Sequence, residues 1–192
     1  MKSSTLFGGQ FIEAGFQEVI VPAIWEAEPF IKKMGDEKNE KLWTFPSKKG
    51  SSLNCLIPEV TAIIQEQWNS GWDRQFKKPF KLFYVSRCYR YDRPQRGRYR
   101  EFTQFGVEVL GKTTPEVILE TKNLLKSCLE ALEIEFEFKD DVIRGIGYYT
   151  EEGFEAESEK LGAQKQIAGG GTYNEGVGWA IGVDRVMLSK FS

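Results

Sequence analysis

The stretch FYVSRCYRYDRPQRGRYREFTQFGVEVLG, from Phe83 to Gly111, carries the strongest signals in this chain. Six arginines fall between Arg87 and Arg100, whereas the whole chain has a formal net charge of −2, so positive charge is concentrated here. The guanidinium group presents a planar fork of donors that suits phosphate and carboxylate oxygens. The run therefore predicts a polyanionic ligand, and a solvated charged loop is the alternative interpretation.

An alternating strand follows the arginines directly. Successive side chains of a strand point to opposite faces. One face is expected to join the core, and it comprises Thr103, Phe105, Val107 and Val109. On the other face, Gln104 and Glu108 flank Gly106, which has no side chain. We expect a small ligand to lie over Gly106 with a polar group at each end; an ordinary half-exposed strand is the alternative.

The segment YRYDRPQRGRYREFTQFGVEVLG, residues 89–111, resembles motif 2 of class II aminoacyl-tRNA synthetases in the form specific to histidyl-tRNA synthetases. That form reads roughly F-R-x-E-R-P-Q-x-G-R-x-R-[QE]-F-x-Q-x-G-x-E. The likeness extends over more than twenty residues with one-for-one spacing.

Further blocks resemble other motifs of this family, in the family's order. GFQEVIVPAIWEAEPFIKKMG (Gly15–Gly35) is similar to motif 1, and IPEVTA (Ile57–Ala62) to the R-P-E-G-T segment. IRGIGYYTEEGFE (Ile143–Glu155) resembles R-G-L-D-Y-Y, and AGGGTY (Ala168–Tyr173) resembles A-G-G-R-Y. GWAIGVDRVML (Gly178–Leu188) resembles motif 3. Together the blocks cover most of the chain.

The fold expected from these patterns is α+β: a class II synthetase-like antiparallel sheet flanked by helices, in a single catalytic domain over residues 1–192. The family's insertion domain and anticodon-binding domain are not expected. The predicted strands are 17–21, 42–45, 53–57, 80–86, 101–110, 134–138, 148–157 and 164–168. The predicted helices are 58–68, 115–132 and 180–190.

Composition excludes several classes of function. No apolar run approaches the length of about 18 residues that a membrane span needs, so we expect no membrane contact and a cytoplasmic location. Three widely spaced cysteines predict reduced thiols and no zinc site. The chain contains no histidine, which excludes Ser-His-Asp and Cys-His nucleophiles and any histidine-ligated metal.

The resemblance implies ATP-dependent amino-acid activation, in which a carboxylate attacks the α-phosphorus of ATP. Arg90 would bind the α-phosphate and Arg185 the γ-phosphate end, with Asp92 and Arg98 also in the ATP site. Arg144 would stand beside the α-phosphate and the substrate carboxylate, where related enzymes use a metal, so no protein metal site is implied. Mg²⁺ would bridge the phosphates.

The resemblance also implies an amino-acid pocket for histidine. Glu59 and Thr61 would hold the α-amino group. Gln104, Glu108 and Tyr149 would line the pocket, with Glu108 accepting an imidazole N–H. Tyr148 is the neighbouring candidate, and alternation along a strand would let at most one of the two tyrosines enter the pocket.

The chain also departs from the family pattern. Gly147 replaces an aspartate, Thr172 an arginine and Ile57 the arginine of R-P-E. Substrate identity is therefore open. The acceptor is also open: it is a tRNA, bound directly or through a partner, or it is a protein, a carrier or a small amine. A non-catalytic regulatory paralogue that senses histidine is the alternative function. We expect a homodimer through residues 11–22, weak binding of free tRNA and no DNA binding.

Overall fold

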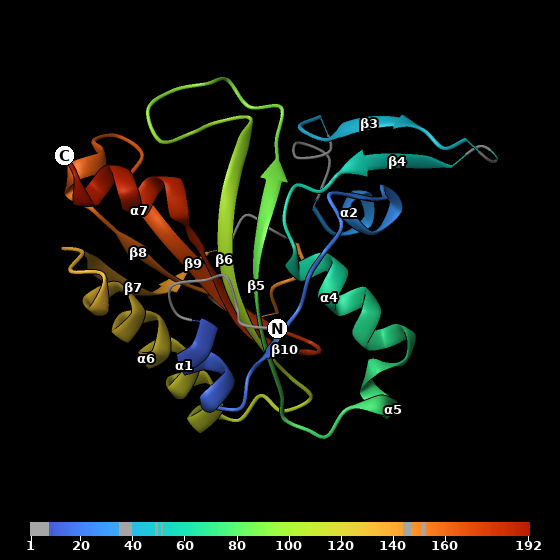
Figure 1. Ribbon diagram of the computed structural model, residues 1–192, viewed down its shortest axis with the longest axis horizontal. Helices are drawn as coiled ribbons and strands as arrows, with labels where there is room; N and C mark the ends of the chain where they lie inside the picture. Colours follow the sequence, from blue (N-terminus) through green and yellow to red (C-terminus); the bar gives the residue numbers. More distant parts are fainter. Residues whose placement is uncertain (1–7, 35–39, 49, 51, 144–146, 151–152) are drawn as a thin grey trace.

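The computed structural model describes residues 8–34, 40–48, 50, 52–143, 147–150 and 153–192 (Figure 1). Its main element is a seven-stranded sheet in the order β1-β5-β6-β10-β9-β8-β7, in which only the β1–β5 pair is parallel. The strands are β1 (Gln17–Glu18), β5 (Phe80–Tyr89), β6 (Glu101–Leu110), β7 (Glu137–Val142), β8 (Gly153–Glu157), β9 (Gln166–Tyr173) and β10 (Gly176–Gly182). The expected α+β class with a mainly antiparallel sheet is confirmed.

The β5–β6 hairpin supplies the second and third strands of this sheet, next to the edge strand β1. Its strands pair without interruption from Phe80 opposite Leu110 to Tyr89 opposite Glu101, and the arginine run forms the connection between them. Both strands are rich in β-branched and aromatic residues, which favour strand structure. The hairpin therefore holds the arginines at the end of a rigid support.

Helices cover both faces of the sheet (Figure 1). One face packs against α6 (Pro115–Ala131), whose Leu125 and Leu129 join a core with Val107 and Trp179. The other face packs against α4 (Thr61–Gln67). The remaining helices in the described ranges are α1 (Gly8–Glu13), α2 (Glu28–Met34), α5 (Asp73–Gln75) and α7 (Val183–Lys190), with single turns at η1 (Trp68–Trp72) and η2 (Glu159–Leu161).

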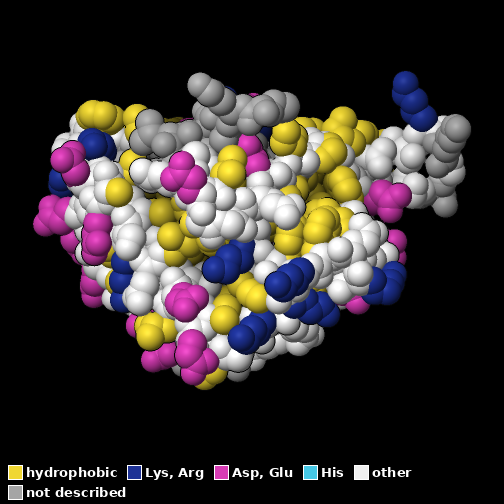
Figure 2. Space-filling view, turned by 60° about the horizontal axis from the view of Figure 1, so that its bottom comes forward, with side chains coloured by type: hydrophobic (Ala, Val, Ile, Leu, Met, Phe, Trp, Pro, Cys, Tyr) yellow, Lys and Arg dark blue, Asp and Glu magenta, His cyan; other side chains and the backbone are white. Residues whose placement is uncertain are grey.

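A second, three-stranded sheet projects beside the hairpin. Its order is β2-β4-β3, with β2 (Ile24–Glu26), β3 (Trp43–Pro46) and β4 (Leu53–Leu56). Figure 2 shows exposed hydrophobic side chains between the projecting β3–β4 turn and the body of the molecule, beside lysine and arginine side chains. Large hydrophobic residues that are exposed in this part of the chain include Ile20, Ile24 and Leu53.

Several expected boundaries are wrong. The closing helix begins at Val183 rather than 180, because Gly176–Gly182 is a strand paired with both β6 and β9. Tyr148 and Tyr149 lie outside any strand, and the described strand begins only at Gly153. The helix expected from Pro58 begins at Thr61, and β9 continues to Tyr173.

No helix in the described ranges combines the length and apolar character needed to cross a membrane.

Candidate active site

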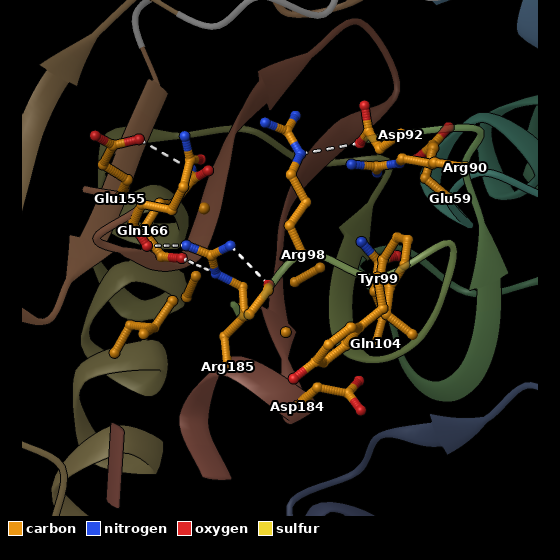
Figure 3. A pocket seen from close by; sticks show the side chains of 18 of the residues that line it. Glu59, Arg90, Asp92, Arg98, Tyr99, Gln104, Glu155, Gln166, Asp184 and Arg185 are labelled. Atoms are coloured by element: carbon orange, nitrogen blue, oxygen red, sulfur yellow. Dashed lines mark hydrogen bonds and ion pairs between the residues drawn. The ribbon is translucent and has the colours of Figure 1, made fainter. Parts of the chain in front are cut away.

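One cavity of about 410 Å³ opens where the arginine hairpin, the start of α4, strands β9 and β10 and the start of α7 meet (Figure 3). All three predicted site arginines that the structure describes line this cavity: Arg90, Arg98 and Arg185. The other predicted residues on its wall are Glu59, Thr61, Asp92, Gln104, Tyr148 and Tyr149. Segments far apart in the sequence thus bring the predicted phosphate-binding and amino-acid-binding residues to one space.

Arg90 is held by two contacts with the protein itself. Its Nε donates a hydrogen bond of 2.9 Å to the carbonyl of Pro58, and its guanidinium lies 5.0 Å from the ring centroid of Phe102. Pro58 immediately precedes Glu59, so the same contact ties the arginine to the neighbouring carboxylate segment. The geometry preorganises the cation before any ligand arrives.

Arg185 bridges the hairpin to strand β9. Its guanidinium donates to the backbone carbonyls of Gly97, Gln164 and Gln166. Burial lowers the pKa of Arg185, and the positive charge of Arg98 lowers it further. Figure 3 shows the Arg98 side chain beside that of Arg185, and an anion bound near both guanidinium groups would relieve their repulsion.

Glu59 is a buried carboxylate, 4% exposed, that lies beside Arg90 (Figure 3). Burial raises the pKa of Glu59, while hydrogen bonds from the Ala62 amide at 2.9 Å and the Tyr148 hydroxyl at 3.2 Å favour the ionised form. A bound ammonium group would stabilise the same ionised form. The position therefore suits a cationic amino group.

The two tyrosines do not divide between opposite faces. Tyr148 and Tyr149 lie outside any strand, so strand alternation does not apply to them; both line the cavity, and their ring centroids are 4.7 Å apart. Gly171 makes this packing feasible, since a Cβ there would lie 2.6 Å from the Tyr149 ring. The prediction that at most one tyrosine enters the pocket is wrong.

Glu108 differs most from expectation. It is completely buried and is not among the cavity-lining residues, because the Tyr84 ring fills the space over Gly106, where a Cβ would meet it at 2.2 Å. Thr61 and Tyr173 each donate a hydrogen bond of 2.6 Å to its carboxylate. Burial raises the pKa of Glu108 to about 8, although these two hydrogen bonds act to lower it. Glu108 thus lies beneath the cavity wall and reaches it through Thr61.

Arg144 lies outside the described residues. The cavity also includes residues that the sequence interpretation missed: Tyr99, Phe102, Glu155, Gln166 and Asp184. Two of them lie in segments that the sequence motifs already mark: Asp184 precedes Arg185, and Tyr99 lies within the arginine run. Glu155 and Gln166, which share a hydrogen bond of 2.9 Å, carried no local signal because β8 and β9 bring them together.

Within the part of the chain that the structure describes, no group of three or more cysteine, aspartate or glutamate side chains is arranged to hold a metal ion. The cavity lining combines three guanidinium groups, which suit phosphate oxygens, with the carboxylates of Glu59, Asp92, Glu155 and Asp184. The described residues therefore fit a nucleotide, and Mg²⁺ would be held chiefly by the phosphates.

Together, the fold and site define a class II aminoacyl-tRNA synthetase-like catalytic core. A family model described as histidyl-tRNA synthetase matches residues 5–139, and the chain belongs to that family. The histidine–tRNA ligase of Sulfolobus acidocaldarius is 37% identical over 144 residues, covering 73% of this chain and 32% of that protein. The histidine–tRNA ligase of Methanosarcina acetivorans is 26% identical over 279 residues, with 90% of this chain and 67% of the relative covered.

The chain thus spans between one third and two thirds of the length of these relatives. The 279-residue alignment is longer than the chain, so part of that relative has no counterpart here.

Solved structures show the same fold. The apo histidyl-tRNA synthetase of S. aureus superposes with a TM-score of 0.75 at 21% identity, covering 94% of this chain and 62% of that one. A Bacillus halodurans protein described as an ATP phosphoribosyltransferase regulatory subunit/histidyl-tRNA synthetase gives 0.78 at 15% identity, covering 94% and 76%.

Proposed function

We propose that this chain activates an amino acid with ATP, with histidine the favoured substrate. The substrate carboxylate forms a bond to the α-phosphorus while the bond to the β-phosphate oxygen breaks, giving an aminoacyl-adenylate and pyrophosphate. The observation that carries the proposal is the joint lining of one cavity by three arginines and a buried carboxylate. The carboxylate nucleophile is already ionised, so a chain without histidine needs no general base for this step.

The described residues would act by position and charge. Arg90, fixed by Pro58 and Phe102, would stabilise the α-phosphate, and Arg98 and Arg185 would bind the leaving pyrophosphate. Asp92 would take part in the ATP site through its pairing with Arg98. Mg²⁺, when bound to ATP, would screen the phosphate charge.

The amino acid would occupy the side of the cavity near α4. Glu59 and Thr61 would hold its ammonium group, with Gln104 and the two tyrosines around the side chain. Glu108 would act through Thr61 rather than by direct contact. Arg144 keeps the role implied by the resemblance, beside the α-phosphate.

A direct test is a single-turnover reaction of ATP, Mg²⁺ and histidine, with histidyl-adenylate detected by mass spectrometry. Adenylate and pyrophosphate in equal amounts are the expected products. Intact ATP after prolonged incubation, with both ligands bound, would contradict the proposal.

A non-catalytic regulatory role is the second candidate, favoured by the likeness in fold to the Bacillus halodurans protein. Such a protein would bind histidine with or without ATP and release no pyrophosphate. Calorimetric titration of histidine, combined with the single-turnover reaction, separates the two functions. A tRNA or another acceptor for the activated amino acid is compatible with the first.

We expect a homodimer formed through residues 11–22. Ile20 is 77% exposed and Ile12 is 47% exposed, and burying such side chains between subunits is favourable by roughly 25 cal/mol per Å² of apolar surface. Light scattering should give twice the chain mass of 22.0 kDa, and Ile20→Asp should shift the population toward monomer. Leu119→Asp, at an exposed position on α6, is the matched control. A 22.0 kDa particle at micromolar concentration would refute the dimer.

This 192-residue chain is expected to bind free tRNA only weakly. Affinity for RNA depends strongly on phosphate neutralisation, whereas the chain carries 26 basic against 28 acidic residues. Arg87 is paired with Glu101 and Arg98 with Asp92, which reduces the free charge of the hairpin. Filter binding at physiological salt measures this directly, and submicromolar affinity for one tRNA would show the prediction to be wrong.

A further inference from the structure

The Asp92 carboxylate lies between two cations from different parts of the chain. Its Oδ2 accepts from Arg98 Nε at 3.0 Å, and its Oδ1 lies 3.1 Å from the Lys41 ammonium. Arg98 belongs to the arginine hairpin, whereas Lys41 precedes β3 of the small sheet. Lys41 is outside every sequence motif described above and does not line the cavity. The side chain of Asp92 is only 9% exposed, so the carboxylate that both cations share is shielded from water.

Three further contacts fix Lys41 and its neighbours to the hairpin. The Tyr91 amide donates to the Lys41 carbonyl at 2.8 Å. The Trp43 and Tyr91 rings meet edge to face with centroids 4.9 Å apart, and the Arg100 guanidinium lies 6.0 Å from the Trp43 centroid. The ammonium of Lys41 therefore approaches Asp92 from a held backbone and not from a freely moving loop.

The charge balance of this group bears on the cavity. With Arg98 alone, the Asp92 carboxylate would cancel the one positive charge that the pair presents to a phosphate. With Lys41 also present, the three groups retain one net positive charge, because one carboxylate is shared by two cations. Figure 3 shows the Arg98 side chain extended toward Asp92 and paired with it, so the position of its guanidinium also depends on where Asp92 is held.

We propose that Lys41 is a positioning residue for the phosphate-binding hairpin: it holds Asp92, and through Asp92 it sets the place and effective charge of Arg98. Its role in ATP affinity rests on the proposed function. Its role in holding the hairpin does not, since the ion pair, backbone bond and ring contacts form without ligand.

The test compares Lys41→Met, Lys41→Arg and Lys48→Met with the parent protein. Lys48 is an exposed lysine that follows β3, whereas Lys41 precedes it. Replacing Lys48 therefore removes one positive charge from the same small sheet. Calorimetry measures affinity for MgATP, and hydrogen exchange measures protection of residues 90–100 without ligand. Lys41→Met should weaken MgATP binding about fivefold and speed exchange in 90–100, with histidine affinity unchanged. Lys41→Arg should restore both properties, and Lys48→Met should change neither.

Equal exchange and equal MgATP affinity in Lys41→Met and the parent would overturn the proposal. So would an equal loss of affinity in Lys48→Met, because the effect would then come from overall charge. If the parent protein binds no MgATP, the proposed function fails, and the exchange comparison alone decides whether Lys41 holds the hairpin. Exchange that is faster in Lys41→Met only, and restored in Lys41→Arg, supports it in that case too.

Discussion

Arg90→Ala is expected to lower the rate of pyrophosphate exchange about 10²–10³-fold while the protein stays folded. Arg90 is held by the Pro58 carbonyl and the Phe102 ring, so its charge is in place before ATP binds and costs little reorganisation in the transition state. Alanine removes that preorganised charge. Exchange kinetics at saturating ATP measure the loss, and circular dichroism checks the fold.

Arg87→Ala is the matched control for this prediction. Arg87 lies on β5, three residues before Arg90, but it pairs with Glu101 at the surface, where both side chains are largely exposed and ion pairs contribute little. Its exchange rate should equal that of the parent. If Arg90→Ala also keeps the parental rate and ATP affinity, the assignment of the phosphate-binding hairpin is wrong.

Glu108→Gln is expected to change the pH dependence of stability. Burial raises the pKa of Glu108 to about 8 in the folded protein, above its value in the unfolded chain. The folded state therefore binds the proton more tightly, and the stability that this group contributes is complete below about pH 4 and is lost as the pH rises towards 8. In that window the parent should lose roughly 1.4 kcal/mol per pH unit from this group. Glutamine, which does not titrate, should remove that loss.

Urea unfolding between pH 5 and 8 measures the difference between the two proteins. Glu135→Gln, at a carboxylate with a side chain 85% exposed, is the control and should follow the parent. Parallel curves for the parent and Glu108→Gln would contradict the buried, proton-binding environment of Glu108. Because Thr61 connects Glu108 to the cavity, histidine affinity should also fall in Glu108→Gln while MgATP affinity stays nearly the same.

Local sequence patterns predicted the hairpin well. Alternation along 101–110 identified the core face, and Phe105, Val107 and Val109 are buried as expected. Arg90, Arg98 and Arg185 meet Glu59, Thr61 and Gln104 at one cavity, and each of these residues lies in a block that the motifs mark. The family resemblance was decisive for linking these blocks, since spacing alone gives no three-dimensional proximity.

Contacts between distant segments could not be predicted in the same way. The face with Gln104 and Gly106 was expected to leave room for a ligand, but the Tyr84 ring from the neighbouring strand covers Gly106. Periodicity also placed 180–182 in a helix, although pairing with β6 and β9 makes them strand. The Lys41–Asp92 pair depends on how the small sheet meets the hairpin, and no local pattern encodes that contact.

The most direct test of the proposed function is ATP–pyrophosphate exchange measured separately with each of the twenty amino acids. The account predicts exchange that depends on histidine and on Mg²⁺ and that is lost in Arg90→Ala. Exchange with a different amino acid would mean that the replacements at Gly147 and Thr172 have changed the pocket. No exchange with any amino acid, in protein that binds both ATP and histidine, would contradict amino-acid activation and favour the regulatory function.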